Sequence, residues 1–187
     1  MRRSGVLLPV TSLPSRFGIG TFSKEAYAFV DFLKEAGQKL WQILPLGPTG
    51  YGDSPYQAFS TFAGNPYLID LEELIENGWL TEEECENTDW GGSKSYVDYE
   101  KMYQGRFPLL RKAYHNSHIA ENAEFIAFCE ENDWWLSDYA LFMAIKDSQG
   151  GASFLEWDAP LKLREPEAIR RCRHELSDEI CFWHFLQ

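Results

Sequence analysis

The sequence predicts an α/β chain that is built on a βαβ unit near its N-terminal end. Residues 6–10 and residues 40–46 are short apolar runs, and residues 23–36 between them repeat apolar side chains at helical spacing. A strand, a helix and a second strand in this order give parallel strands of one sheet. Such a unit belongs to a doubly wound sheet or to a (β/α)8 barrel, and both place functional loops at the carboxyl ends of their strands.

Turn and capping residues predict where these elements end. A loop rich in Ser, Pro and Gly follows the first strand over residues 11–20. Ser23 is of a type that caps helices, and Gly37 is well placed to end the helix because glycine adopts the left-handed conformation of a C-terminal cap. The second strand ends at Pro45 and Gly47. The long loops after both strands are what an active-site face requires.

The rest of the chain is predicted to be helical. Helices are expected at residues 71–77, after a cap at Thr81, and at residues 98–115, 122–132, 134–146 and 166–187, with a loop at 150–160. Because no strand alternates with them, residues 71–165 are interpreted as a mostly helical insertion. The last helix keeps an apolar face and ends on FWHFLQ without a stop signal, which predicts that the chain is cut there.

Composition excludes several classes of function. The net charge of the 187 residues is −12, which disfavours binding to nucleic acid and to anionic membrane surfaces. No apolar run approaches the length of a membrane span. The four cysteines and four histidines are scattered without metal-ligand spacing, so no metal site is expected. Reduced structural thiols favour the cytoplasm.

Residues 47–70 are the most informative segment, GPTGYGDSPYQAFSTFAGNPYLID. Four glycines, three prolines and three tyrosines directly after a predicted strand indicate an elaborate loop. Tyrosines offer flat apolar faces together with hydroxyl groups, which suits the C–H faces and hydroxyl edges of sugar rings. Asn65 before Pro66 favours a turn, and Asp53 before Ser-Pro suits an Asx-type turn better than catalysis. Trp41 and Trp157 are predicted to be core residues.

The ordered Gly, Pro and aromatic positions of residues 5–22 and 39–74 resemble the start of the 4-alpha-glucanotransferases, also called amylomaltases, of glycoside hydrolase family 77. Residues 134–142 and 154–160 resemble the middle region of that family. The resemblance implies the N-terminal part of a (β/α)8 TIM barrel with a helical insertion. Residues 1–70 would supply the first two β/α elements, residues 71–165 the insertion, and residues 166–187 a helix returning to the barrel.

The resemblance also implies an activity and a set of site residues. Family members transfer α-1,4-glucan segments between maltodextrins with retention of configuration, through a covalent glycosyl-enzyme, and no cofactor or metal is implied. Tyr56 matches a tyrosine that packs against a bound sugar, Ser54 is a candidate donor to glucan hydroxyls, and Tyr51 is a candidate for a second glucan site.

Retaining transfer needs two carboxyl groups, and no motif in this chain matches those of the family. The chain alone is therefore predicted to be inactive. Two other readings stay open, a glucan-binding module without chemistry and an interaction protein built on the helical segment. Two barrel strands by themselves are expected to leave open edges and an uncovered apolar face.

Overall fold

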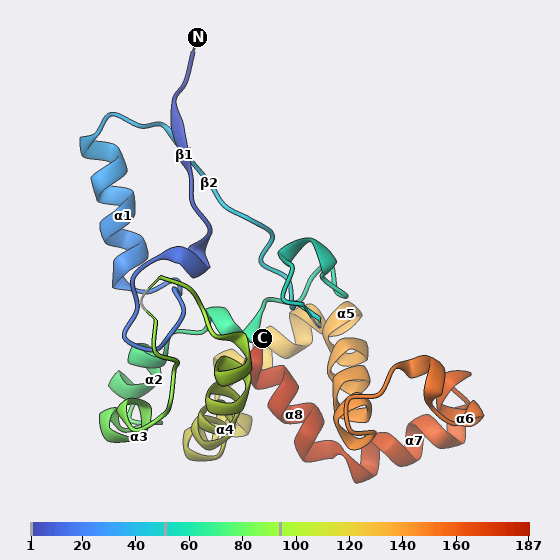
Figure 1. The fold of residues 1–187 in the computed structure, drawn as a ribbon. Helices are drawn as coiled ribbons and strands as arrows, with labels where there is room; N and C mark the ends of the chain where they lie inside the picture. The colour runs from blue at the N-terminus through green and yellow to red at the C-terminus, as the bar shows by residue number, and fades with distance from the viewer. Residues whose placement is uncertain (1, 51, 94) are drawn as a thin grey trace. The chain divides into compact units, whose positions relative to one another are not determined.

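Two short parallel strands, β1 (Gly5–Leu7) and β2 (Leu40–Gln42), are joined by the helix α1 (Lys24–Glu35), as Figure 1 shows. Gly5 pairs with Leu40, and Leu7 pairs with Gln42. The predicted βαβ unit is confirmed, but both strands are shorter than the apolar runs that predicted them. β1 ends early because the N–H of Leu8 makes the last bond to β2, at 3.0 Å from the carbonyl of Gln42, and the chain turns into a 3-10 helix at Val10.

The structure is a computed structural model that describes residues 2–50, 52–93 and 95–187. The chain divides into two compact units, one that ends at Ser117 and one that spans His118–Gln187. After β2, the described part of the first unit contains the 3-10 helices η2 (Pro55–Gln57) and η3 (Pro66–Leu68) and the α-helices α2 (Leu71–Glu76), α3 (Glu82–Glu86) and α4 (Tyr99–Ser117). A further 3-10 helix, η1 (Val10–Ser12), follows β1. The predicted division into residues 1–70, 71–165 and 166–187 concerns a barrel and its insertion, and it stays a prediction.

The ends of α1 lie where the sequence predicts them. Ser23 is the N-cap, and its hydroxyl lies 2.8 Å from Oε2 of Glu25. Gly37 has a φ of +71°, and the N–H of Gln38 returns to the carbonyl of Leu33 at 2.9 Å. This backbone turn closes the helix, so the connection to β2 begins directly after it.

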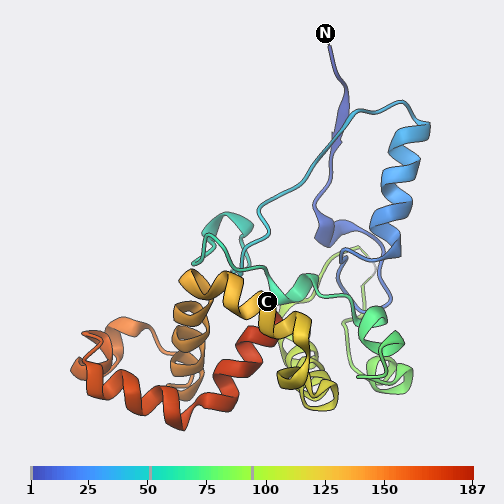
Figure 2. The same cartoon turned by 180° about the vertical axis from the view of Figure 1, so that it is seen from behind.

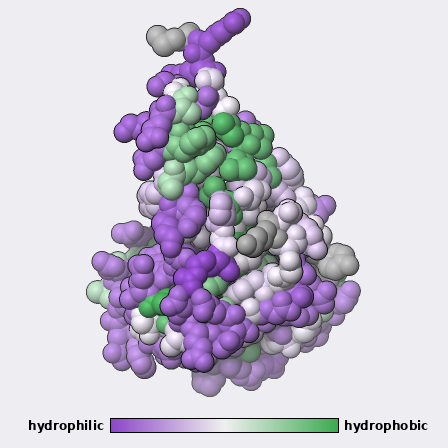
Figure 3. All heavy atoms as spheres, turned by 60° about the vertical axis from the view of Figure 1, so that its left-hand side comes forward, coloured by the Kyte–Doolittle hydropathy of each residue, from purple (hydrophilic) through white to green (hydrophobic). Residues whose placement is uncertain are grey.

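The two faces of the β1–β2 pair have different surroundings. The ring of Trp41 meets the ring of Phe29 on α1 edge-on, with centroids 5.0 Å apart, so α1 covers the face that carries Trp41. Leu7 and Leu40 lie on the opposite face by strand alternation, and they are 56% and 51% exposed. Figure 3 shows hydrophobic side chains at the surface of the N-terminal part of the chain. The expected uncovered apolar face is therefore confirmed.

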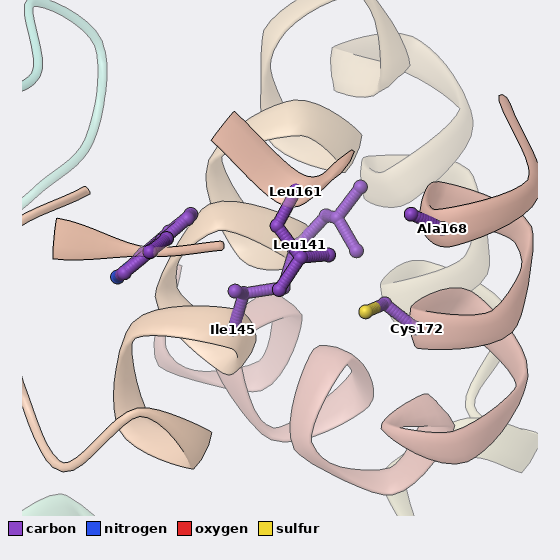
Figure 4. Packing of buried hydrophobic residues seen from close by; sticks show 6 residues of the cluster. Leu141, Ile145, Leu161, Ala168 and Cys172 are labelled. Atoms are coloured by element: carbon purple, nitrogen blue, oxygen red, sulfur yellow. The ribbon is translucent and has the colours of Figure 1, made fainter. Parts of the chain in front are cut away.

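The second unit is helical in its described residues. It contains η4 (Ile119–Glu121), α5 (Ala123–Ser148), η5 (Phe154–Glu156), α6 (Ala159–Lys162), α7 (Pro166–Glu175) and α8 (Ser177–Leu186), and Figure 2 shows these helices from behind. Its core joins α5, α6 and α7 through side chains that point toward one another (Figure 4). Trp157 belongs to this core and Trp41 packs against the core next to β1, which confirms both predictions.

Three predictions for the second unit are wrong. The helices predicted at 122–132 and 134–146 are one helix, α5, since the Asn132 amide donates to the carbonyl of Phe128 at 2.9 Å instead of breaking the helix. The single helix predicted at 166–187 is divided at Leu176, whose backbone leaves the helical conformation. The loop predicted at 150–160 contains η5 and the start of α6.

Candidate functional site

A cavity of about 120 Å³ lies at the carboxyl ends of β1 and β2. The residues that follow β1 contribute Val10 and Thr11 to its lining, and the residues that follow β2 contribute Leu46 and Thr49. Carboxyl ends of parallel strands are where α/β folds place their sites. Whole ligand pockets usually measure about 300–1,000 Å³, so this cavity has room for part of a ligand.

Two tyrosines from different elements form one wall of the cavity. Tyr67 lies in η3 and Tyr99 begins α4, and their ring centroids are 6.0 Å apart. Asn65 caps η3, because its Oδ1 accepts a hydrogen bond from the N–H of Tyr67 at 3.0 Å. Burial raises the pKa of Tyr67 to about 12 and also raises the pKa of Tyr99. Both phenols are therefore neutral at physiological pH and can donate or accept hydrogen bonds.

Asp53 is the one carboxyl group among the described residues that line the cavity. It closes a tight turn, because its N–H donates to the carbonyl of Gly50 at 3.1 Å. Gly52 in this turn has a φ of +94°, and Asp53 itself has a φ of +53°. Burial raises the pKa of the Asp53 carboxyl. The carboxyl accepts none of the hydrogen bonds found among the described residues, so the predicted Asx-type turn is replaced by a backbone turn.

The predicted sugar-contacting residues lie beside this cavity without lining it. Ser54 is the N-cap of η2, and its hydroxyl makes no capping hydrogen bond. The side chain of Tyr56 in η2 is 74% exposed. Pro55 between them lines the cavity, so both residues lie at its rim. Tyr51 lies outside the described residues.

Sequence reasoning missed four of the polar residues of the cavity, which are Thr11, Thr49, Tyr67 and Tyr99. Thr11 and Thr49 carried a usable signal, because both lie within three residues of the end of a predicted strand. Tyr67 and Tyr99 carried none, because only the packing of η3 against α4 brings them together. Asn65 was predicted to be structural, and its capping role confirms that.

The chemistry of the cavity suits a neutral ligand with several hydroxyl groups. Hydroxyl, amide and carboxyl groups surround an apolar floor of Val10, Leu44 and Leu46. Retaining glycosyl transfer requires two carboxyl groups that flank the bond, and Asp53 alone does not provide that pair. No group of three His, Cys, Asp or Glu side chains among the described residues is arranged to hold a metal ion. None of the described helices is long and apolar enough to cross a membrane.

Comparison with known families identifies the class of this protein. The model of the 4-alpha-glucanotransferase family, glycoside hydrolase family 77, matches residues 8–187, and the chain belongs to that family. The matched range includes every described residue that lines the cavity, from Pro9 to Tyr99.

Individual relatives agree with this assignment. The chain is 46% identical to a 4-alpha-glucanotransferase of Clostridium butyricum over 95% of its residues, and 47% identical to one of Thermus thermophilus over all of them. Among solved structures it is similar to the amylomaltase from Streptococcus agalactiae in complex with acarbose, with a TM-score of 0.94 and 45% identity over the whole chain. The chain spans 37% of the length of the two curated relatives and 38% of the solved chain.

Proposed function

We propose that this chain serves as the N-terminal, glucan-binding part of a retaining 4-alpha-glucanotransferase. The observation that carries the proposal is the cavity at the carboxyl ends of β1 and β2, lined by hydroxyl and amide groups within the residues that match the family. The ligands in this reading are α-1,4-glucans such as maltooligosaccharides. Neither a nucleic acid nor a membrane is part of the proposal, and the proposed location is the cytoplasm.

The β1–α1–β2 unit corresponds in this proposal to the first elements of a (β/α)8 barrel. Parallel sheets are usually covered on both faces, whereas here α1 covers only the face that carries Trp41. Leu7 and Leu40 on the other face would then point into the barrel, where bulky side chains form packed layers. The mostly helical residues 71–165 would be the insertion, and residues 166–187 would return to the barrel.

Within this part, the proposal assigns each predicted site residue a role. Tyr56 presents its ring at the rim, where it can stack on a sugar face. Ser54 offers a hydroxyl that is not used for capping η2. Tyr51 stays a candidate for a second glucan site.

The chemistry proposed for the complete enzyme is a double displacement. One carboxylate attacks the anomeric carbon and forms the glycosyl-enzyme, while a second carboxyl group protonates the leaving oxygen and later activates the acceptor hydroxyl. This chain provides neither group, so its contribution is to bind and orient the glucan.

An assay of glucose release from maltotriose tests the proposal. We expect the complete gene product to release glucose and to form longer maltodextrins, and we expect residues 1–187 alone to do neither. Absence of transfer by the complete gene product, combined with saturable binding of maltoheptaose, would replace the enzyme by a binding module. Glucose release by residues 1–187 alone would contradict the assignment of the catalytic carboxyl groups to other residues.

A further inference from the structure

The loop between β2 and η3 leaves the cavity and returns to it at one point. Residues 47–64 form this loop, and the two residues that flank it, Leu46 and Asn65, both line the cavity. The N–H of Asn65 donates to the carbonyl of Leu46 at 2.8 Å. The loop is therefore closed at its base, and the contacts that it makes with this base decide where its tip lies.

Gly47, at the base of the loop, lies in close contact with a later part of the same loop. A Cβ atom added at Gly47 would lie 2.8 Å from the Cβ of Ala58 and 3.2 Å from the carbonyl oxygen of Ser60. Carbon atoms in contact are usually about 3.5–4.0 Å apart, so a side chain at residue 47 would overlap with Ala58. Gly47 is not among the glycines with a positive φ. The close approach, and not the backbone conformation, therefore accounts for a glycine here.

Ala58 connects this contact to the rim of the cavity. It is the C-cap of η2, and the N–H of Gln57 donates to the carbonyl of Ser54 at 3.0 Å, which ties the turn together. Within η2, Pro55 lines the cavity and Tyr56 presents its ring at the rim. A displacement of Ala58 would therefore move the ring of Tyr56.

The residues that follow Ala58 are anchored, whereas η2 is free to move outward. The Ser60 hydroxyl accepts from the N–H of Ala63 at 3.1 Å, and Ala63 is 4% exposed. Tyr56 and Ala58 are both exposed. Strain from a side chain at residue 47 would thus be relieved by a shift of η2 away from the cavity.

We propose that Gly47 is a positioning residue of the glucan site. Because it carries no side chain, Ala58 can lie against the base of the loop, and this contact sets the distance of the Tyr56 ring from the cavity. The position of the rim is in this way fixed by the small combined size of residues 47 and 58. This inference rests on the proposed function, because it needs Tyr56 to contact the glucan.

The test measures kcat and KM for maltotriose, together with Tm, for variants of the complete gene product. We expect Gly47→Ala to raise KM about fivefold, the effect of losing one ring contact. It should change kcat less than about twofold, because a contact at the rim binds the substrate and the transition state alike. Gly92→Ala is the matched control, since a Cβ added at Gly92 would meet nothing within 4 Å, and it should change neither value.

Exchanging the two side chains tests the contact directly. Ala58→Gly removes the methyl group that a Cβ at residue 47 would meet. Gly47→Ala combined with Ala58→Gly should therefore return KM to within about twofold of the native value, a non-additive result that is expected only if the two side chains compete for one space. Adding Gly47→Ala to Tyr56→Ala should raise KM no further, because the ring that would be moved is already missing.

The remaining outcomes separate this inference from the proposed function. If Tyr56→Ala raises KM and Gly47→Ala does not, the positioning role is wrong while the glucan site stands. The inference is also overturned if Gly47→Ala lowers only Tm or only kcat, or if Ala58→Gly fails to restore KM. If Gly47→Ala does not fold, the exchange variant decides: a native KM supports the inference, and a second failure to fold overturns it. If Tyr56→Ala leaves KM unchanged, the glucan site itself is wrong, and the inference is wrong with it.

Discussion

Arg106 shows how single residues fix the wall of the cavity. Its side chain has no exposed surface in the middle of α4, and its Nη2 donates to the carbonyl of Ile69. Burial lowers the pKa of Arg106 to about 10, against the opposite effect of Asp70, so the guanidinium stays charged at neutral pH. Asp70 caps α2 by accepting from the N–H of Glu72 at 3.1 Å. The segment that carries Tyr67 is therefore fixed at both ends. Asn65 holds the N–H of Tyr67, and Arg106 holds the carbonyl of Ile69.

The contribution of Tyr67 to the stability of the protein is lost at alkaline pH. Because burial raises its pKa from 10.0 to about 12, folding favours the neutral phenol. This contribution is complete below pH 10 and is lost as the pH rises toward 12, and two pKa units correspond to about 3 kcal/mol. We expect the free energy of unfolding to fall less between pH 10 and 12 in Tyr67→Phe than in the native protein, measured by denaturant unfolding.

The control for this prediction is Tyr27→Phe, since the side chain of Tyr27 is 74% exposed. It should keep the pH dependence of the native protein. Arg106 is present in all three proteins and its charge interacts with Tyr67, so the comparison reports the titration of the two groups together. The prediction is wrong if Tyr67→Phe and the native protein lose equal stability between the two pH values.

At the scale of elements, α3 depends on its N-terminal cap because it spans only Glu82–Glu86. The Thr81 hydroxyl accepts from the N–H of Glu84 at 3.3 Å, and the Glu84 carboxylate accepts from the N–H of Thr81 at 2.9 Å. Removing such a cap costs about 1 kcal/mol. We expect Thr81→Ala to speed hydrogen exchange of the α3 amides and Thr81→Ser to leave it nearly unchanged. Equal protection in both variants would show that packing, and not the cap, holds this helix.

The core of the second unit is expected to depend on the buried face of α5. Leu141 is 1% exposed and packs among side chains of α6 and α7, as Figure 4 shows. Leu141→Ala should lower the free energy of unfolding by about 2–5 kcal/mol, through lost apolar burial and the cavity left behind. Leu163→Ala is the matched control, because Leu163 is 72% exposed and its truncation should change stability by less than about 0.5 kcal/mol. Similar losses in the two variants, measured by denaturant unfolding, would contradict this core.

Local signals explain which elements were predictable from the sequence. Ser23, Gly37 and Thr81 set helix ends through their own neighbours, and each lies where the structure needs it. The start of α8 had a similar signal in Ser177 and Asp178, but the apolar spacing across Leu176 concealed it. The pairing of Tyr67 with Tyr99 had no local signal, because it depends on tertiary packing. The loop was therefore predictable from local signals, and the wall of Tyr67 and Tyr99 was not.

For the molecule as a whole, the surface of residues 1–187 combines a net charge of −12 with exposed apolar side chains on the β1–β2 pair. The charge opposes association, whereas an uncovered sheet face and open strand edges favour it. The charge is spread over the chain, while Leu7 and Leu40 lie together on one face, with Leu40 opposite Gly5 in the register. At about 0.1 M salt, charges more than about 10 Å apart are largely screened. The apolar face should therefore decide whether two chains associate once they come close.

We accordingly expect residues 1–187, expressed alone, to associate as their concentration rises. Replacing both Leu7 and Leu40 by Thr keeps the β propensity of the strands and removes the apolar face, so association measured by light scattering should fall. Leu163→Thr makes the same change at an exposed position of the second unit and should leave association unchanged. A chain that stays monomeric with a sharp thermal transition would refute the expectation. Equal association of the double variant and the native chain would show that another surface causes the association. The exposed face of the β1–β2 pair would then no longer support the proposal that further barrel strands pack against it.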